Sequence, residues 1–388
     1  MLWKYWKRYY SSWNGVNNIE NHKKIELTEL LFRKASQLRI PLSGTFELSP
    51  VCNFSCPMCY VRKTRAEVAQ SSRGIFTKEE WLEIARQAKD AGMLYLLLTG
   101  GEPFLWDDFW ELYDELAQMG FVISINTNGY LVDETVVARL KKSPPLKINI
   151  TLYGASDETY RNMCGIEKGF TRVSRAITLL KEAGILVKLN CSLTPENVQD
   201  LAEMVAYAKE RELALQVATY MFPPVRRNPE QIGCNERFTP QEAAKAHIDY
   251  YRACYGEEQF QSYLKAILKN KEPQNVPEDF TCKMKCRAGK AAFWITWDGW
   301  MTPCGMMSEP KVDIRKMHFA DAWKEIVERS NKIKVSSTCS TCEKKEICHA
   351  CAAMAYAETG TFHEVPKYLC ETANALQIEA RKLLYKED

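Results

Sequence analysis

The chain has 388 residues, of which 46% are hydrophobic and 26% charged, with a formal net charge of +3. These values are typical of a well-packed globular protein, and the length favours two domains over one. The small charge argues against a strong nucleic-acid footprint, and no apolar run approaches the roughly 18 residues of a membrane-spanning helix. Residues 1–10 interleave aromatic and basic side chains and lack the apolar core of a secretory signal. We therefore expect a cytoplasmic protein with no membrane or nucleic-acid partner.

Residues 1–42 are expected to form an N-terminal extension. Lys4, Lys7 and Arg8 alternate with tryptophans and tyrosines. Such a stretch suits docking of a peptide or an acidic partner, or covering the open end of the next domain. We favour the covering role.

A short apolar run at residues 44–48 predicts a strand, and three cysteines follow it. Cys52, Cys56 and Cys59 have the spacing C-x3-C-x2-C. Three thiolates at this spacing can hold three corners of a cubane iron–sulfur cluster, which leaves the fourth iron without a protein ligand. An open coordination position is where substrate binds to a metal. A zinc site, or half of a ferredoxin-type motif, is also compatible with the three cysteines alone.

A second apolar strand begins near Leu94 and runs into Gly100-Gly101-Glu102-Pro103. Glycines let the backbone approach a ligand closely. Glu102 supplies a carboxylate where a ligand ammonium group would sit. An ordinary strand-to-helix turn is the alternative interpretation.

Four further strands are predicted, with helical stretches between them. The strands are at residues 122–126, 147–152, 186–190 and 215–219, and the helices include residues 78–91, 109–119 and 170–183. Alternating strands and helices indicate a parallel sheet, and six strands suit an α/β fold of the partial (β/α)6 TIM-like barrel type. Such barrels place ligands at the carboxyl ends of their strands. This rule nominates Asn128, Thr151 and Arg161 as further site residues.

The cysteine triplet and the Gly100–Pro103 motif together resemble the radical S-adenosylmethionine (radical SAM) enzymes. The resemblance implies that the open iron chelates the amino and carboxylate groups of SAM, and that Gly100, Gly101, Glu102 and Pro103 hold its amine. It also implies that Thr151 contacts SAM and that Arg161 pairs with its carboxylate. Met58 stands where this superfamily typically has an aromatic residue, and a methionine can pack on an adenine face.

Most of the remaining cysteines lie near the C-terminus. The spacings are C-x12-G-x4-C from Cys286 to Cys304 and C-x2-C-x5-C-x2-C from Cys339 to Cys351, followed by Cys370. Fifteen cysteines without a signal peptide favour metal ligands or catalysts over disulfides. The pattern resembles the seven-cysteine SPASM domain that follows the barrel in peptide-modifying radical SAM enzymes. One departure is that two residues, not three, separate Cys348 from Cys351.

The SPASM resemblance implies two auxiliary 4Fe–4S clusters, with Cys282 as the eighth thiol. By order, auxiliary cluster I takes Cys282, Cys286, Cys304 and Cys351, and auxiliary cluster II takes Cys339, Cys342, Cys348 and Cys370. One or two four-cysteine zinc sites are the alternative. The other cysteines are expected to be inert thiols, although one of them follows Arg161 on the active-site side of the barrel; they are Cys164, Cys191, Cys234 and Cys254.

The expected domains follow from these patterns. They are an N-terminal extension (1–42), a radical SAM barrel (43–222), a helical bridge with one helix from Pro240 to about Lys269 (223–281), a SPASM domain (282–372) and a C-terminal helix (373–388).

The resemblance implies an enzyme with SAM and three 4Fe–4S clusters as cofactors. It would cleave SAM to a 5′-deoxyadenosyl radical, with electrons from a flavodoxin- or ferredoxin-type donor. The expected substrate is a ribosomally made peptide, oxidised to a thioether, a carbon–carbon crosslink or a dehydrogenated product. Peptide-modifying relatives often carry a winged-helix leader-recognition domain, for which 40 residues are too few, so a separate protein or another surface would hold any leader.

Other functions stay open. Sulfatase-maturing relatives have an aspartate where this chain has Gly305, so that activity ranks lower. A SPASM oxidase of a small molecule is one rival, and a non-catalytic metal-binding or electron-transfer protein is another. No catalytic residue is assigned, because core or rim packing explains Tyr153 and Tyr220, near strand ends, equally well.

Overall fold

The six predicted parallel strands form one curved sheet in the computed structural model, which describes residues 27–234, 236–269 and 284–385. Each strand pairs with its sequence neighbour in parallel, as the prediction of a partial barrel requires. The strands are β1 (Ser43–Glu47), β2 (Tyr95–Thr99), β3 (Val122–Thr127), β4 (Lys147–Thr151), β5 (Val187–Ser192) and β6 (Ala214–Ala218).

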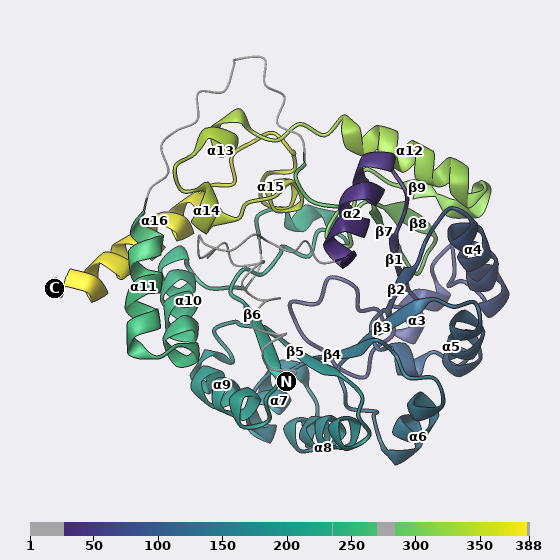
Figure 1. Ribbon diagram of the computed structural model, residues 1–388, viewed down its shortest axis with the longest axis horizontal. Helices are drawn as coiled ribbons and strands as arrows, with labels where there is room; N and C mark the ends of the chain where they lie inside the picture. The colour runs from purple at the N-terminus through teal and green to yellow at the C-terminus, as the bar shows by residue number, and fades with distance from the viewer. Residues whose placement is uncertain (1–26, 235, 270–283, 386–388) are drawn as a thin grey trace.

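Helices cover the outer face of this sheet (Figure 1). Thr77 begins one of them with a capping box, because its side chain accepts from the amide of Glu80 and the Glu80 side chain accepts from the amide of Thr77. The helices of the barrel are α3 (Arg65–Ala69), α4 (Lys78–Asp90), α5 (Phe109–Gln118), α6 (Glu134–Lys142), α7 (Asp157–Cys164), α8 (Gly169–Glu182) and α9 (Leu201–Glu210). The three helices predicted in this region are confirmed within one or two residues at each end.

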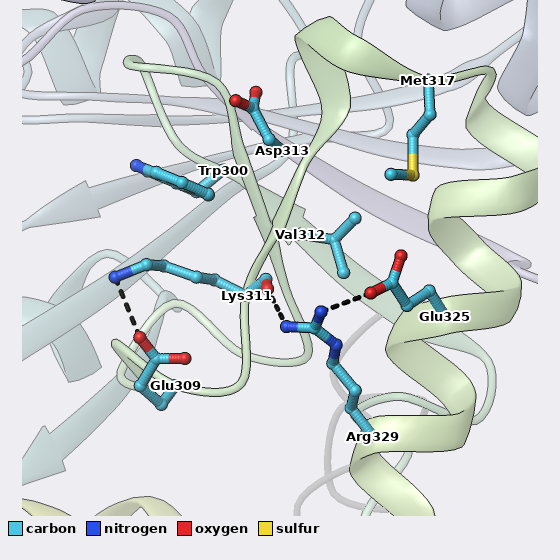
Figure 2. A pocket seen from close by; sticks show the side chains of 8 residues that line it. All are labelled: Trp300, Glu309, Lys311, Val312, Asp313, Met317, Glu325 and Arg329. Carbon is cyan, nitrogen blue, oxygen red and sulfur yellow. Dashed lines mark hydrogen bonds and ion pairs between the residues drawn. The ribbon is translucent and has the colours of Figure 1, made fainter.

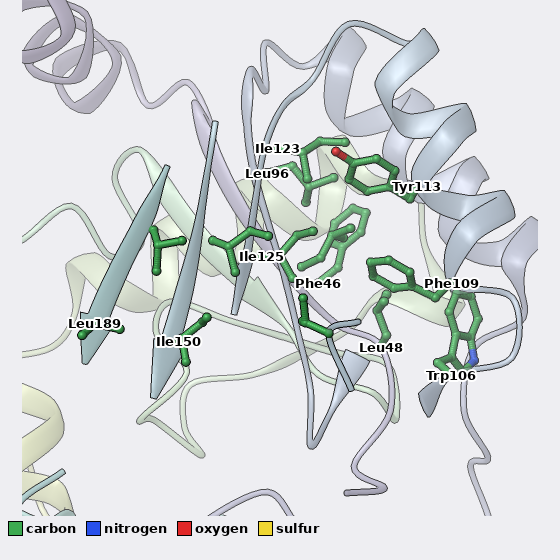
Figure 3. Close-up of a cluster of buried hydrophobic side chains, with 14 of the residues drawn as sticks. Phe46, Leu48, Leu96, Trp106, Phe109, Tyr113, Ile123, Ile125, Ile150 and Leu189 are labelled. Carbon is green, nitrogen blue, oxygen red and sulfur yellow. The ribbon is translucent and has the colours of Figure 1, made fainter. Parts of the chain in front are cut away.

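The two faces of the sheet differ in chemistry because side chains alternate along a strand. Outward-facing residues such as Leu96, Ile125 and Leu189 are buried in one hydrophobic cluster with residues of the covering helices. Within this cluster Tyr113 of α5 lies beside Leu96 and Ile123 (Figure 3). This apolar layer is the main core and fixes the strand register.

The inner face is polar and only half buried. Along β3, β4 and β5 it carries Ser124, Asn126, Asn149 and Lys188. Asn149 donates to Asn126 at 2.7 Å, and Lys188 donates to Gln216 of β6. Half-buried polar side chains on this face suit contact with a polar ligand.

Among the described residues the sheet continues beyond the six predicted strands to nine. β7 (Ala292–Ile295) pairs in parallel with the second edge of β1, and β8 (Trp300–Thr302) and β9 (Val312–Asp313) continue the sheet antiparallel. These strands have two to four residues, too few for a period-2 pattern to stand out. Their pairing covers an edge of β1 that would otherwise present unpaired amides and carbonyls.

The bridge also differs from the prediction of one helix from Pro240 to Lys269. It contains two helices, α10 (Pro240–Cys254) and α11 (Glu257–Leu268), because Tyr255 and Gly256 adopt extended backbone angles between them. The C-terminal helix α16 (Lys367–Tyr385) packs on both helices in a second apolar cluster that includes Ile248, Leu264 and Leu376. This helix begins before the predicted residue 373.

Shorter elements complete the fold. The remaining helices are α2 (Leu27–Leu38), α12 (Phe319–Asn331), α13 (Ser337–Thr341), α14 (Lys345–Cys348) and α15 (Ala352–Thr359), and 3-10 turns occur at Pro103–Leu105, Val198–Asp200, Pro229–Gln231 and Ile314–Lys316. No helix in the described ranges has the length and apolar character needed to cross a bilayer. The domain boundaries stay a prediction.

Replacing Trp81 with alanine should lower the free energy of unfolding by about 3–5 kcal/mol. Trp81 is fully buried in α4, with its ring 4.7 Å from that of Phe46 and 4.6 Å from that of Phe76. Urea unfolding of the two proteins measures the change. Leu146→Ala, at a side chain that is 49% exposed, is the control and should change stability by about 0.5 kcal/mol or less. Equal effects of the two substitutions would contradict the core assignment.

Candidate active site

The three N-terminal cysteines lie in an irregular loop that follows β1. Phe54, within this loop, is buried against the rings of Tyr153 and Tyr160, at centroid distances of 5.9 and 6.2 Å. The amide and the hydroxyl of Ser55 both donate to the carbonyl of Cys164, at 2.8 and 3.1 Å. The loop is therefore fastened to α7 and to the end of β4 by packing and by hydrogen bonds.

Burial and backbone amides set the chemistry of these thiols. The amide of Phe54 donates to Sγ of Cys52 at 3.4 Å, and the amide of Arg62 donates to Sγ of Cys59 at 3.3 Å. Burial raises the pKa of Cys52 to about 12, and the charges of Glu102 and of the other two cysteines raise it as well. A thiolate in this loop therefore gains stability from a positive partner such as a metal ion.

Cys56 has two neighbours that the sequence did not assign to the site. The thiol of Cys164 and the hydroxyl of Tyr153 both hydrogen-bond to Cys56 and lower the pKa of its thiol, against the effect of burial. Cys164 was predicted to be an inert buried thiol; it is buried, and it also contacts the cysteine loop. In the sequence, only the position of Cys164 shortly after Arg161 indicated that it lies on the active-site side of the barrel.

The loop after β2 packs directly on the cysteine loop. The amide of Gly101 donates to the carbonyl of Ser49 at 2.7 Å, and the amide of Glu102 donates to that of Val51 at 2.9 Å. A Cβ atom at Gly100 would stand 2.4 Å from the Ser49 oxygen, and one at Gly101 would stand 2.4 Å from the Val51 oxygen. Only glycine fits at both positions, so the glycines hold the two loops together.

Glu102 is completely buried beside these loops. Its carboxylate accepts hydrogen bonds from the hydroxyl of Thr127 at 2.8 and 2.9 Å, from the amide of Asn128 at 2.8 Å and from that of Phe104 at 3.2 Å. Burial raises its pKa to about 7. In the part of the chain that the structure describes, no cation forms an ion pair with it, although a buried carboxylate favours one.

Asn128 connects Glu102 to the cysteine loop. Its side-chain amide donates to Oδ1 of Asn53 at 2.8 Å and lies 3.7 Å from Sγ of Cys52. Nδ2 of Asn53 is buried without a hydrogen-bond partner in the structure. The centre therefore contains both a carboxylate without a cation partner, that of Glu102, and an amide donor without an acceptor, that of Asn53.

The other predicted SAM contacts lie around this centre. Pro103 begins the 3-10 turn after Glu102, Met58 packs against the main core, and Thr151 is the last residue of β4. Arg161 is about half exposed and forms an ion pair with Glu167 at 2.7 Å. Its predicted role toward the SAM carboxylate stays a prediction.

The first group of C-terminal cysteines lies near the end of β8. Burial raises the pKa of Cys304 to about 11, and the neighbouring thiolates of Cys351 and Cys286 raise it further. Cys286 has the same effect on Cys351. Cys282, the fourth predicted ligand, lies outside the described residues. The other three members of predicted cluster I are therefore neighbours.

The second group gathers around α14 and the start of α16. Burial raises the pKa of Cys348 to about 11, and the thiolates of Cys370, Cys339 and Cys342 raise it as well. These are the four residues that the sequence order assigns to cluster II. The two-residue gap between Cys348 and Cys351 does not prevent the two cysteines from belonging to different groups.

The spacing within these groups is wider than one metal ion requires. Within the described ranges, no three histidine, cysteine or acidic side chains converge closely enough to hold a single ion. A cubane cluster binds each thiolate through a different iron, so it does not need the sulfurs to converge on one atom. The identity of the bound metal stays a prediction.

A surface hollow of about 380 Å³ lies away from the N-terminal cysteine loop, between the β8–β9 hairpin and α12 (Figure 2). Its charges satisfy one another, since Lys311 pairs with Glu309 at 2.9 Å and Arg329 pairs with Glu325. None of the residues lining it is a predicted site residue. The hollow therefore does not compete with the cysteine loops as the candidate site.

The comparison with protein families agrees with this geometry. Residues 46–208 match the model of the Radical SAM superfamily. This part of the chain is a radical SAM domain. It contains the cysteine loop, Glu102 and the carboxyl ends of β1–β5.

Similarity to known proteins extends beyond this domain. The chain is 25% identical over 346 residues to "AdoMet-dependent heme synthase" of Methanosarcina barkeri, which covers 83% of this chain and 94% of that protein. The fold is similar to that of Streptococcus suis SuiB bound to its precursor peptide SuiA, with a TM-score of 0.62 and 18% identity over 95% of this chain and 87% of SuiB. It is also similar to anSMEcpe with bound AdoMet, with a TM-score of 0.66 and 20% identity over 89% of this chain and 98% of that one. At these identities the two structures establish the fold alone.

The buried carboxyl of Glu102 predicts how stability depends on pH when neither metal nor SAM is bound. Its pKa is raised from 4.5 to about 7, so the folded state binds this proton more tightly than the unfolded state, and stability falls as the pH rises between these values. Glu102→Gln removes this effect, so between pH 4.5 and 7 the variant should gain about 3 kcal/mol relative to the wild type.

Urea unfolding across this pH range tests the prediction, with Glu203→Gln, at an exposed position, as the control. Parallel pH profiles for the wild type and Glu102→Gln would contradict it.

Proposed function

We propose that this radical SAM protein cleaves SAM reductively and uses the resulting radical to oxidise a peptide. The observation that carries the proposal is the buried carboxylate of Glu102, which has no described cation partner and lies beside a loop of three cysteines. The ammonium group of SAM supplies the missing cation. The unpartnered Nδ2 of Asn53 can donate to its carboxylate.

The residues present fit a 4Fe–4S group at the cysteine loop. Cys52, Cys56 and Cys59 would hold it, and amides that already point at two of the sulfurs stabilise thiolate charge. When bound, this group supplies the electron that cleaves SAM to a 5′-deoxyadenosyl radical. Glu102 and its hydrogen-bond donors would orient the methionine end of SAM, and Met58 would pack on the adenine.

The C-terminal cysteines would hold two auxiliary 4Fe–4S groups, with Cys282 completing the first. Such groups can accept the electron that remains on the substrate radical, which permits net oxidation of the substrate. The division into a barrel (43–222) and a SPASM domain (282–372) belongs to this proposal. A reducing, cytoplasmic location suits so many free thiols, and a flavodoxin- or ferredoxin-type protein would supply the first electron.

A peptide substrate is supported by the structural neighbours. SuiB was crystallised with its precursor peptide, and another anSMEcpe structure with a TM-score of 0.65 contains a peptide named Cp18Cys. The polar, half-open inner face of the sheet offers hydrogen-bonding groups of the kind that a peptide backbone needs. A separate leader-binding protein is compatible with this proposal.

A small-molecule substrate is the second candidate. It is favoured by the match to a heme synthase over 94% of that relative's length. In this case an iron porphyrin would take the place of the peptide.

Cys56→Ala should abolish SAM cleavage without emptying the C-terminal sites. The reconstituted wild type is expected to bind about 12 irons and the variant about 8, because each cubane contributes four. Iron and sulfide counting, electron paramagnetic resonance (EPR) and chromatographic detection of 5′-deoxyadenosine measure these outcomes. Cys191→Ala, at a buried cysteine outside the site, is the matched control and should keep cleavage. Cleavage by the Cys56 variant would overturn the assignment.

The substrate class is tested by giving the reduced enzyme and SAM either candidate precursor peptides or an iron porphyrin. We expect a SAM-dependent change in the intact mass of a peptide. A mass change in the porphyrin alone would transfer the assignment to the small-molecule candidate.

A further inference from the structure

An arginine of the bridge reaches the region between two cysteine sites. Arg226 follows β6 and forms an ion pair with Glu47, the last residue of β1. Its Nη2 atom lies 2.9 and 3.0 Å from the two carboxylate oxygens of Glu47. The side chain of Arg226 is 11% exposed and that of Glu47 is fully buried. Trp294 of β7 donates to the same carboxylate at 2.9 Å.

The other edge of the guanidinium faces the C-terminal cysteines. Nη1 of Arg226 donates to the carbonyl of Gly305 at 2.7 Å, next to Cys304. The guanidinium also lies 5.3 Å from the ring centroid of Tyr60, which directly follows Cys59 in the N-terminal loop.

Burying an ion pair costs desolvation energy, so this pair is not explained by stability alone. Glu47 offsets much of the arginine's charge, but it does so at Nη2, whereas Nη1 donates to the carbonyl of Gly305. The cation is therefore the member of the pair that faces the cysteine group. A cation beside a cluster favours its reduced state, which carries one more negative charge.

We propose that Arg226 is a positioning residue that stabilises negative charge on the group held by Cys304 and so raises its reduction potential. The inference rests on the proposed auxiliary cluster at this site. In the relevant step the cluster accepts one electron from the substrate radical of the proposed function, which is thereby oxidised, and the cluster takes up no proton. The effect makes this cluster a better electron acceptor than it would be without Arg226.

The neighbouring residue provides a matched control. Arg227 carries the same charge in the same segment, but it is exposed, and its side chain donates to the carbonyl of Pro57 in the N-terminal loop at 3.4 Å. Arg226→Gln and Arg227→Gln each remove one positive charge. Arg226→Lys keeps the charge but loses the planar guanidinium that donates to two partners at once. The double variant Glu47→Gln/Arg226→Gln avoids an unpaired buried carboxylate.

The test is an EPR-monitored redox titration of each reconstituted protein with and without SAM, which separates the SAM-perturbed signal from the auxiliary signals. Arg226→Gln should lower the reduced-to-oxidised ratio of one auxiliary cluster roughly tenfold at a fixed potential, a shift of about −59 mV for a one-electron couple. The double variant should lower this ratio by less, because it also removes the negative charge of Glu47. Arg226→Lys should stay near the wild type, and Arg227→Gln should leave this signal unchanged.

Unchanged auxiliary potentials in both Arg226→Gln and the double variant would overturn this inference while leaving the proposed function intact. So would equal shifts in Arg226→Gln and Arg227→Gln. A wild-type protein that binds no auxiliary cluster would overturn both the inference and the auxiliary part of the proposed function.

Discussion

The contact between two backbones at the carboxyl ends of β1 and β2 is the constraint on which the site depends. The carbonyls of Ser49 and Val51 lie where the Cβ atoms of Gly100 and Gly101 would otherwise stand. Because the two loops approach this closely, the carboxylate of Glu102 is buried beside Cys52 and away from water. Burial then raises the pKa of both groups. The same packing therefore buries a carboxylate that favours a cationic partner and a thiol whose ionised form favours a metal ion.

The sequence predicted the barrel well because its signals are local. The six strands carry apolar residues in short runs or at alternate positions, and glycines mark the ends of three helices at Gly92, Gly120 and Gly184. Parallel strands place their carboxyl ends at one edge, so the motifs after β1 and β2 had to meet. The expected reason for the paired glycines was close approach to a ligand, whereas in the structure they approach the cysteine loop itself.

The features that the sequence missed depend on contacts between distant segments. β7 is too short to predict, and only pairing with the free edge of β1 makes it a strand. Arg226 lies in a proline-rich bridge, where nothing local distinguishes it from Arg227. The hydrogen bonds to Cys56 come from Tyr153 and Cys164. In the sequence both residues could equally be ordinary core residues. The break near Gly256 was hidden because helical periodicity continues on both sides of it.

β1 connects the two halves of the candidate machinery. One of its edges pairs with β2 and the other with β7, and the loop of N-terminal cysteines follows it directly. Glu47, at its end, binds Arg226 from the bridge and Trp294 from β7. A single strand with both edges hydrogen-bonded thus fixes how far the Cys304 group lies from the Cys52 loop. The two cysteine sites therefore keep a constant separation, because the strands that precede them belong to one sheet.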